Sequence, residues 1–181
     1  MEKQATRDAY GQALVELGKH YEDVVVLDAD LSKSTKTADF ARVFPERFFN
    51  AGIAEQNLMG MSAGLAACGK IVYASTFAVF ATGRAFEQVR NSLAYGKLNV
   101  KVCATHAGIT VGEDGGSHQS VEDIALMRSV PNMTVVVPAD GVTARKAVFA
   151  LYHREGPCYL RLGRPALPIV HDQNADFQIG Q

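Results

Sequence analysis

The sequence predicts an α/β fold in which a parallel sheet of about six strands is covered by helices on both faces. Segments with helical periodicity alternate with short apolar segments along the chain. The short segments are apolar at consecutive positions, which is typical of strands that are buried on both faces of a sheet. The chain has 181 residues and is 48% hydrophobic, so one domain with a sizeable core is expected.

The N-terminal part of the chain predicts a helix, a strand, a short helix and a second strand. The first helix is expected over 6–19, with an apolar stripe formed by Ala9, Ala13, Leu14 and Leu17. Strands are expected over 24–27 and 47–50. The short helix over 37–43 ends before Pro45, because a residue that precedes proline disfavours the helical conformation.

The rest of the chain continues this alternation. A helix over 55–68 has no charged residue from Gln56 to Gly69, so we expect it to be buried on more than one side. The remaining elements are expected as strands over 71–74, 100–104, 134–137 and 158–162 and as helices over 79–95, 120–128 and 141–153. The domain is assigned to 1–170, and the polar tail 171–181 is expected to be a linker toward a further domain.

Composition argues against several classes of protein. The net charge of −1 gives no electrostatic basis for binding nucleic acid or an anionic membrane, and neither a membrane span nor a signal peptide is recognisable. Cys68, Cys103 and Cys158 lie far apart among apolar residues, so they are expected to be buried free thiols in a reducing, cytoplasmic setting. A catalytic thiol is the alternative, but no activating neighbour stands out.

Glu55 is the first candidate functional residue, in a first helical turn that follows a glycine turn. The helix dipole favours an acid at this position, so a simple helix-start role is the alternative. The uncharged helix that follows argues for a functional role beyond the helix start, because a carboxylate that enters a buried helix needs a partner. Arg7, Arg161 and Arg164 are candidates for holding an anion, with surface ion pairs as the alternative.

Three polar segments are expected at the carboxyl ends of strands, where sites form in parallel sheets: 28–34, 75–80 and 105–118. Phe77 and Phe80 suit stacking on a flat ligand, although core packing is the alternative. The last segment holds two His, two acids and four Gly, which suits a small polyhydroxy substrate. A solvated turn is one alternative; a metal site is another, but no metal-ligand spacing is present and no metal is assigned.

Together these segments resemble the pyrimidine-binding domain of thiamine diphosphate enzymes, and specifically of the transketolase family. The most specific parts are Gly-Ile-Ala-Glu-Gln at 52–56, Ser-Thr-Phe at 75–77, Gly-Glu-Asp-Gly at 112–115 and Ser-His-Gln at 117–119. The resemblance runs over about 6–168 and implies the thiamine diphosphate-binding fold. It also implies transfer of a two-carbon ketol unit between sugar phosphates.

The resemblance assigns a role to each candidate residue. Glu55 would hydrogen-bond the ring nitrogen N1′ of the aminopyrimidine and favour its imino tautomer. Phe80 would stack on that ring, Phe77 would line the pocket, and Asp30 would lie near the cofactor. Substrate hydroxyl and carbonyl groups would be bound by His106, Asp114 and His118, of which the two histidines are also candidate catalytic residues. Phosphate would be bound by Arg7, Ser34 and Arg164.

Two departures from the family pattern matter. Gly83 stands where the family often has a tyrosine, so the pyrimidine pocket is either more open or filled by another group. No Gly-Asp-Gly motif with a downstream Asn is present to hold Mg²⁺ and the diphosphate. The resemblance therefore implies half of a split transketolase. The Mg²⁺ would be held by an N-terminal partner subunit that carries the diphosphate-binding domain, in a homodimer or heterotetramer.

Other functions remain open at this point. A deoxyxylulose-phosphate synthase usually has an Asp-Arg pair where this chain has Thr105 and His106. The beta chain of a 2-oxo-acid dehydrogenase shares the Glu and Phe elements but not the loop. A non-catalytic assembly module would need none of Glu55, His106, Asp114 and His118, all of which are present.

Overall fold

The sheet at the centre of the molecule has six strands that all run parallel. The structure is a computed structural model and describes residues 2–180. The strand order is β3-β2-β4-β5-β7-β6. The strands are β2 (Val24–Asp28), β3 (Phe48–Asn50), β4 (Ile71–Phe77), β5 (Val100–Thr105), β6 (Thr134–Val136) and β7 (Cys158–Arg161). The predicted fold class, a parallel sheet of about six strands, is confirmed.

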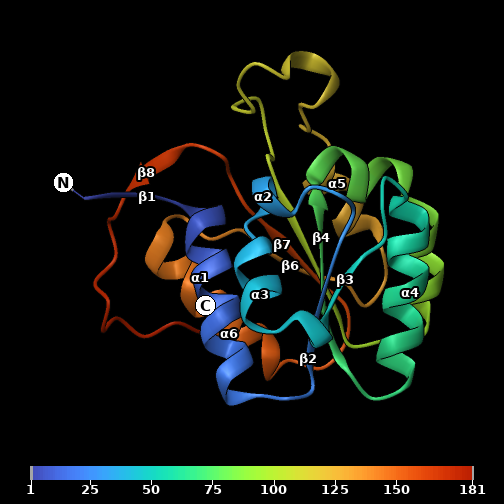
Figure 1. Ribbon diagram of the computed structural model, residues 1–181. Coiled ribbons are helices and arrows are strands. Elements are labelled where there is room, and N and C mark those ends of the chain that lie inside the picture. Colours follow the sequence, from blue (N-terminus) through green and yellow to red (C-terminus); the bar gives the residue numbers. More distant parts are fainter. Residues whose placement is uncertain (1, 181) are drawn as a thin grey trace.

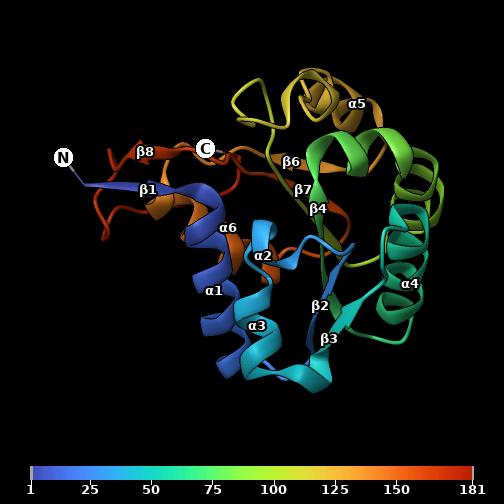
Figure 2. The same ribbon diagram turned by 45° about the horizontal axis from the view of Figure 1, so that its top comes forward.

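Helices cover both faces of this sheet (Figures 1 and 2). One face packs against α1 (Thr6–His20), α3 (Ala38–Val43) and α6 (Gly141–Tyr152), whose apolar side chains form one core cluster. The other face packs against α4 (Glu55–Ala67), α5 (Asp123–Ser129) and the helical segments η2 (Phe80–Arg84) and η3 (Gln88–Tyr95), which share the second cluster. The central strands are buried along their whole length because both faces are covered.

Short elements complete the chain. A two-stranded antiparallel sheet pairs β1 (Lys3–Ala5) with β8 (Ala166–Pro168) and so brings the two ends of the domain together. The other short elements are α2 (Ser32–Thr35), η1 (Pro45–Arg47) and η4 (Gly115–Ser117). The two-stranded sheet and α2 were not predicted, because elements of three or four residues carry no periodicity.

The predicted helix over 79–95 is present but is wound differently from expectation. Two stretches of it, η2 and η3, are π-helical, and the amide of Ala85 donates to the carbonyl of Phe80, five residues earlier. Sequence periodicity does not reveal a π-turn, since single π-turns insert into an otherwise α-helical pattern. Such turns are frequent at functional sites, and this one lies directly after β4.

Two expectations about burial were wrong. Helix α4 buries one face only, through Glu55, Leu58, Met59 and Ser62, and exposes Gln56, Asn57, Gly60 and Gly64. Its lack of charge therefore does not reflect burial within this chain. Cys68 is exposed at the end of this helix, whereas Cys103 and Cys158 are buried as expected. Among residues 2–180, no helix is long and apolar enough to cross a membrane.

Candidate active site

The candidate site lies at the carboxyl edge of the sheet. Strand β2 ends at Asp28, β4 at Phe77 and β5 at Thr105, and each is followed by one of the predicted polar segments. These strands are neighbours in the sheet, so their ends lie next to each other. The segment after β5 forms the loop that projects from the top of the molecule in Figure 1.

Four predicted residues form an aromatic cluster: Phe77, Phe80, His106 and His118. The Phe77 ring stacks on His106 with 3.8 Å between centroids, and the rings of Phe77 and Phe80 are nearly parallel at 5.9 Å. The ring of His118 stands edge-on to Phe80 at 5.3 Å. The structure thus brings two residues predicted for the cofactor, Phe77 and Phe80, together with two predicted for the substrate, His106 and His118. Apolar ring faces of this kind can hold a flat ligand.

His106 is held in one tautomer by its neighbours. Arg7 Nη1 lies 3.1 Å from Nε2 and Thr105 Oγ1 lies 2.9 Å from Nδ1. An arginine has no acceptor, so Nε2 must accept from Arg7, and Nδ1 carries the proton and donates to Thr105. Burial, followed by the positive charges of Arg7 and Arg164, lowers the pKa of His106 to about 4. The imidazole is therefore neutral at physiological pH.

Arg7 is the centre of the predicted anion site. Besides contacting His106, it donates to the backbone carbonyl of Ser34 at 3.2 Å. The segment that carries Ser34 is fixed by the buried carboxylate of Asp28, which accepts hydrogen bonds from Leu31 N and from the hydroxyls of Thr35 and Thr37. Burial raises the pKa of Asp28, and the hydrogen bonds oppose this rise. A buried network therefore positions Ser34 beside Arg7.

Arg164 is engaged by an acid of the projecting loop. It makes a two-pronged ion pair with Glu113, with Nη2 3.0 Å from Oε1, and it also donates to the carbonyl of Val111. This pairing raises the pKa of Arg164 and lowers that of Glu113. Gly112 has a φ of 90°, and a Cβ there would collide with the guanidinium of Arg164. The glycine is therefore required for this contact.

Two further predicted residues, Asp30 and Asp114, are exposed. Asp30 adopts a φ of 59° after β2 and is held by Asn50, whose amide donates to it at 3.3 Å. Asp114 lies in the projecting loop, where its backbone carbonyl accepts a hydrogen bond from Ser117.

Arg161, a candidate for holding an anion, is fixed in an ion pair with buried Asp123 at 2.7 Å, and Asp123 also accepts a hydrogen bond from Tyr159. This arginine is structural and is not a free anion clamp.

Glu55 begins α4 and is 5% exposed. Its partner is Arg84, whose Nη1 donates to Oε1 at 3.0 Å and whose guanidinium lies 4.0 Å from the centre of the Phe80 ring. The prediction that this carboxylate needs a partner is borne out, but the partner itself was missed. Arg84 directly follows Gly83, and a Cβ at Gly83 would meet nothing within 4 Å.

These residues fit the aminopyrimidine half of thiamine diphosphate. A buried carboxylate can accept from a ring N–H, and the neighbouring aromatic rings offer a stacking surface. Among residues 2–180, no group of three or more His, Cys, Asp or Glu side chains is placed to hold a metal ion. Glu55 and Arg84 line a shallow pocket with Ile53, Ala54, Gln56 and Asn57.

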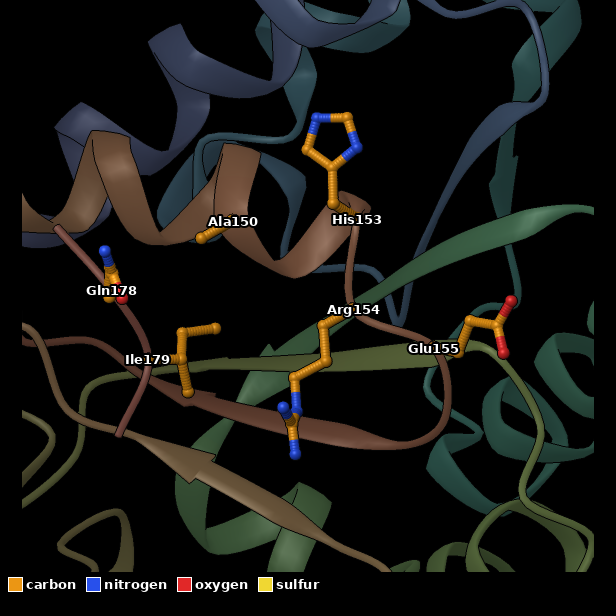
Figure 3. A pocket seen from close by; sticks show the side chains of 6 residues that line it. All are labelled: Ala150, His153, Arg154, Glu155, Gln178 and Ile179. Carbon is orange, nitrogen blue, oxygen red and sulfur yellow. The ribbon is translucent and has the colours of Figure 1, made fainter. Parts of the chain in front are cut away.

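A second hollow lies elsewhere, between the end of α6 and the C-terminal tail (Figure 3). It is lined by Ala150, His153, Arg154, Glu155, Gln178 and Ile179. Its residues 153–155 precede β7, so it lies at the amino edge of the parallel sheet. Sites of parallel sheets form at the other edge, and none of the predicted site residues reaches this hollow.

Comparison with known proteins identifies the class to which this fold and site belong. The family described as the transketolase pyrimidine binding domain matches residues 2–170. The chain belongs to this family.

Individual relatives agree with this assignment. The chain is 58% identical over 177 residues to a transketolase C-terminal section from Methanocaldococcus jannaschii, covering 97% of this chain and 56% of that protein. It is 43% identical over 181 residues to the human transketolase, covering 99% of this chain and 29% of that enzyme. A solved split-gene transketolase, described as an inactive beta4 tetramer, superposes with a TM-score of 0.90 at 60% identity, covering 99% of this chain and 58% of that one.

The chain therefore spans little more than half the length of the split relatives and under a third of the human enzyme.

Proposed function

We propose that this chain supplies the pyrimidine half of a thiamine diphosphate-dependent transketolase, which moves a two-carbon ketol unit between sugar phosphates. The single observation that carries the proposal is Glu55, a buried carboxylate that is linked through Arg84 to the Phe80 ring of the aromatic cluster. Membership of the transketolase pyrimidine-binding family supports it. The free cysteines support a cytoplasmic setting.

Each candidate residue has a task in this proposal. Glu55 accepts a hydrogen bond from the aminopyrimidine N1′ and so controls the proton at that atom, while Phe80 and Phe77 orient the ring. Thiamine diphosphate, when bound, supplies a carbanion at its thiazolium ring. His106 and His118 contact the substrate at its hydroxyl and carbonyl groups. Neutral His106 presents no competing positive charge to Arg7, which together with Ser34 and Arg164 binds the substrate phosphate.

The second half of the site is proposed to come from an N-terminal subunit with the diphosphate-binding domain, which also holds Mg²⁺. The relative from Methanocaldococcus jannaschii is described as a C-terminal section, which fits an enzyme divided between two chains. The exposed face of α4, with Gln56, Asn57, Gly60 and Gly64, is the proposed contact surface, because it lies next to Glu55 and carries no charge.

Ketol transfer by the reconstituted enzyme tests the proposal. Glu55→Gln keeps the shape of the side chain but removes its charge, so the rate is expected to fall about a hundredfold to ten-thousandfold. Glu87→Gln is the matched control, since Glu87 is an exposed acid that pairs with Arg90 and should leave the rate unchanged. Near-normal turnover in Glu55→Gln would contradict the assigned role. Turnover of a 2-oxo acid, or no turnover by the wild type with its partner, would favour the alternative functions.

A further inference from the structure

Arg84 makes both contacts by which this site is expected to hold a flat nitrogen heterocycle. Its guanidinium donates to Glu55 Oε1 at 3.0 Å and lies 4.0 Å from the centre of the Phe80 ring. Among residues 2–180, no other side chain forms a hydrogen bond or ion pair with Glu55. A guanidinium is flat, positively charged and rich in N–H donors, so it resembles a protonated aminopyrimidine in the features that a carboxylate and an aromatic face recognise.

We propose that Arg84 is an internal counter-ion that the aminopyrimidine of thiamine diphosphate must displace, so that Arg84 sets how tightly the cofactor binds. This inference rests on the function proposed above. A heterocycle that stacks on Phe80 within reach of Glu55 Oε1 competes with the guanidinium for the same oxygen and the same ring. Arg84 and the heterocycle therefore exclude each other at this position.

The unequal exposure of the two partners allows the exchange. The side chain of Arg84 is 53% exposed, whereas that of Glu55 is 5% exposed. Arg84 can move into water at little cost, because its charge is already half solvated. Glu55 cannot follow it and would be left as a buried carboxylate without a partner. An incoming N–H donor restores that partner, so release of Arg84 and binding of the ring are coupled.

The π-turn places Arg84 at this position. The wide turn over Phe80–Arg84 is closed by the hydrogen bond from Ala85 N to Phe80 O. This turn places the guanidinium of Arg84, its last residue, over the ring of Phe80, its first residue. The carbonyl of Arg84 accepts from Gln56 Nε2 at 3.2 Å, which ties its backbone to the start of α4. The backbone is therefore fixed and the exchange requires movement of the side chain alone.

Arg84→Met is the informative variant, since it keeps an unbranched apolar stem and removes the charge and the N–H donors of the guanidinium. Arg90→Met is the matched control, because Arg90 lies in the next helical segment and pairs with exposed Glu87 at 2.7 Å. The affinity for thiamine diphosphate with Mg²⁺ is measured by calorimetry on the complex of this chain with its partner subunit. Arg84→Met is expected to bind roughly threefold to tenfold more tightly than the wild type, with Arg90→Met unchanged.

The same calorimetric titration can contradict the inference. Affinity that is unchanged or weaker in Arg84→Met would overturn the inference and show that the arginine does not oppose the cofactor. If neither wild type nor variant binds thiamine diphosphate, the proposed function itself fails and the inference fails with it.

A second measurement does not need the cofactor. Urea unfolding of this chain is followed for Glu55→Gln, Arg84→Met and the double variant. Arg84→Met alone is expected to lower the unfolding midpoint, and the added Glu55→Gln is expected to recover part of that loss, because the unpaired carboxylate is then removed. Strictly additive effects would overturn the role of Arg84 as the counter-ion of Glu55.

Discussion

At the scale of single residues, the site depends on a histidine that stays neutral. His106 accepts from Arg7 and donates to Thr105, and this arrangement requires that only one ring nitrogen carries a proton. Burial and two nearby arginines act in the same direction and lower its pKa to about 4. Protonation of His106 would add a third positive charge close to those of Arg7 and Arg164 and would break the hydrogen bond from Arg7.

The lowered pKa of His106 makes the folding stability of the chain depend on pH. Between the unfolded pKa of about 6.5 and the folded value of about 4, the unfolded chain binds the proton more strongly, so folding stability falls as the pH is lowered through this window. The contribution of His106 is about 2–3 kcal/mol. Chemical unfolding at pH 7 and pH 4 should show that His106→Asn loses less stability than the wild type by about this amount. The same substitution at exposed His153 should leave the wild-type difference in place, and an equal loss in wild type and His106→Asn would contradict the account.

Lys101 is a second residue whose burial has a measurable consequence. It is fully buried in β5, and its ammonium donates to Asn99 Oδ1 and to the carbonyls of Arg154 and Gly156. Burial lowers its pKa. Lys101→Met leaves these acceptors without a donor, so we expect a loss of about 2–4 kcal/mol in urea unfolding. Exposed Lys33→Met should change stability by less than about 0.5 kcal/mol, and a similarly small loss for Lys101→Met would contradict this assignment.

The residues of the site could be predicted to different extents. The aromatic cluster could be predicted because its members follow the ends of neighbouring strands, where a parallel sheet gathers side chains. Arg84 could not, because its distance to Glu55 depends on a π-turn that leaves no mark in the periodicity of the sequence. The pairing of Arg164 with Glu113 also depends on the three-dimensional path of the projecting loop.

At the scale of elements, α4 shows why a lack of charge does not identify a buried helix. The helix lies on the outside of the domain, and Gly60 and Gly64 have nothing within 4 Å of where a Cβ would be. These glycines have no steric role within the chain, although each weakens the helix relative to alanine. A face of this kind is explained if it packs closely against another chain.

This interpretation predicts opposite effects on folding and on assembly. Gly64→Ala should stabilise the isolated chain by about 0.5–1 kcal/mol in thermal or urea unfolding. Gly60→Gln combined with Gly64→Gln should leave the chain folded but weaken association with the partner subunit about tenfold or more, measured by analytical ultracentrifugation. Ala125→Gln, on the exposed side of α5, is the control. Undiminished association of the double variant would show that α4 lies outside the interface.

The central strands and long helices could be predicted because their apolar patterns are long enough to be unambiguous, as in β2 and α1. The pairing of β1 with β8 could not, since it joins two three-residue segments from opposite ends of the domain. Prediction failed where structure depends on contacts between distant segments and not on local pattern.

At the scale of the whole molecule, the proposed function assigns one half of a cofactor site to this chain. In this proposal Glu55 and the aromatic cluster bind the pyrimidine, whereas no Gly-Asp-Gly motif with a downstream Asn for the diphosphate and its Mg²⁺ occurs in the sequence. A diphosphate bridged by Mg²⁺ normally supplies much of the anchoring of such a cofactor. The account therefore requires two chains for binding as well as for turnover.

Calorimetric titration of thiamine diphosphate with Mg²⁺ tests this requirement most directly. The titration is performed on this chain alone, on the partner subunit alone and on their equimolar mixture. The account predicts weak or undetectable binding to each chain alone and tight binding to the mixture, which is lost when this chain carries Glu55→Gln. Tight, Mg²⁺-dependent binding to this chain alone would contradict it.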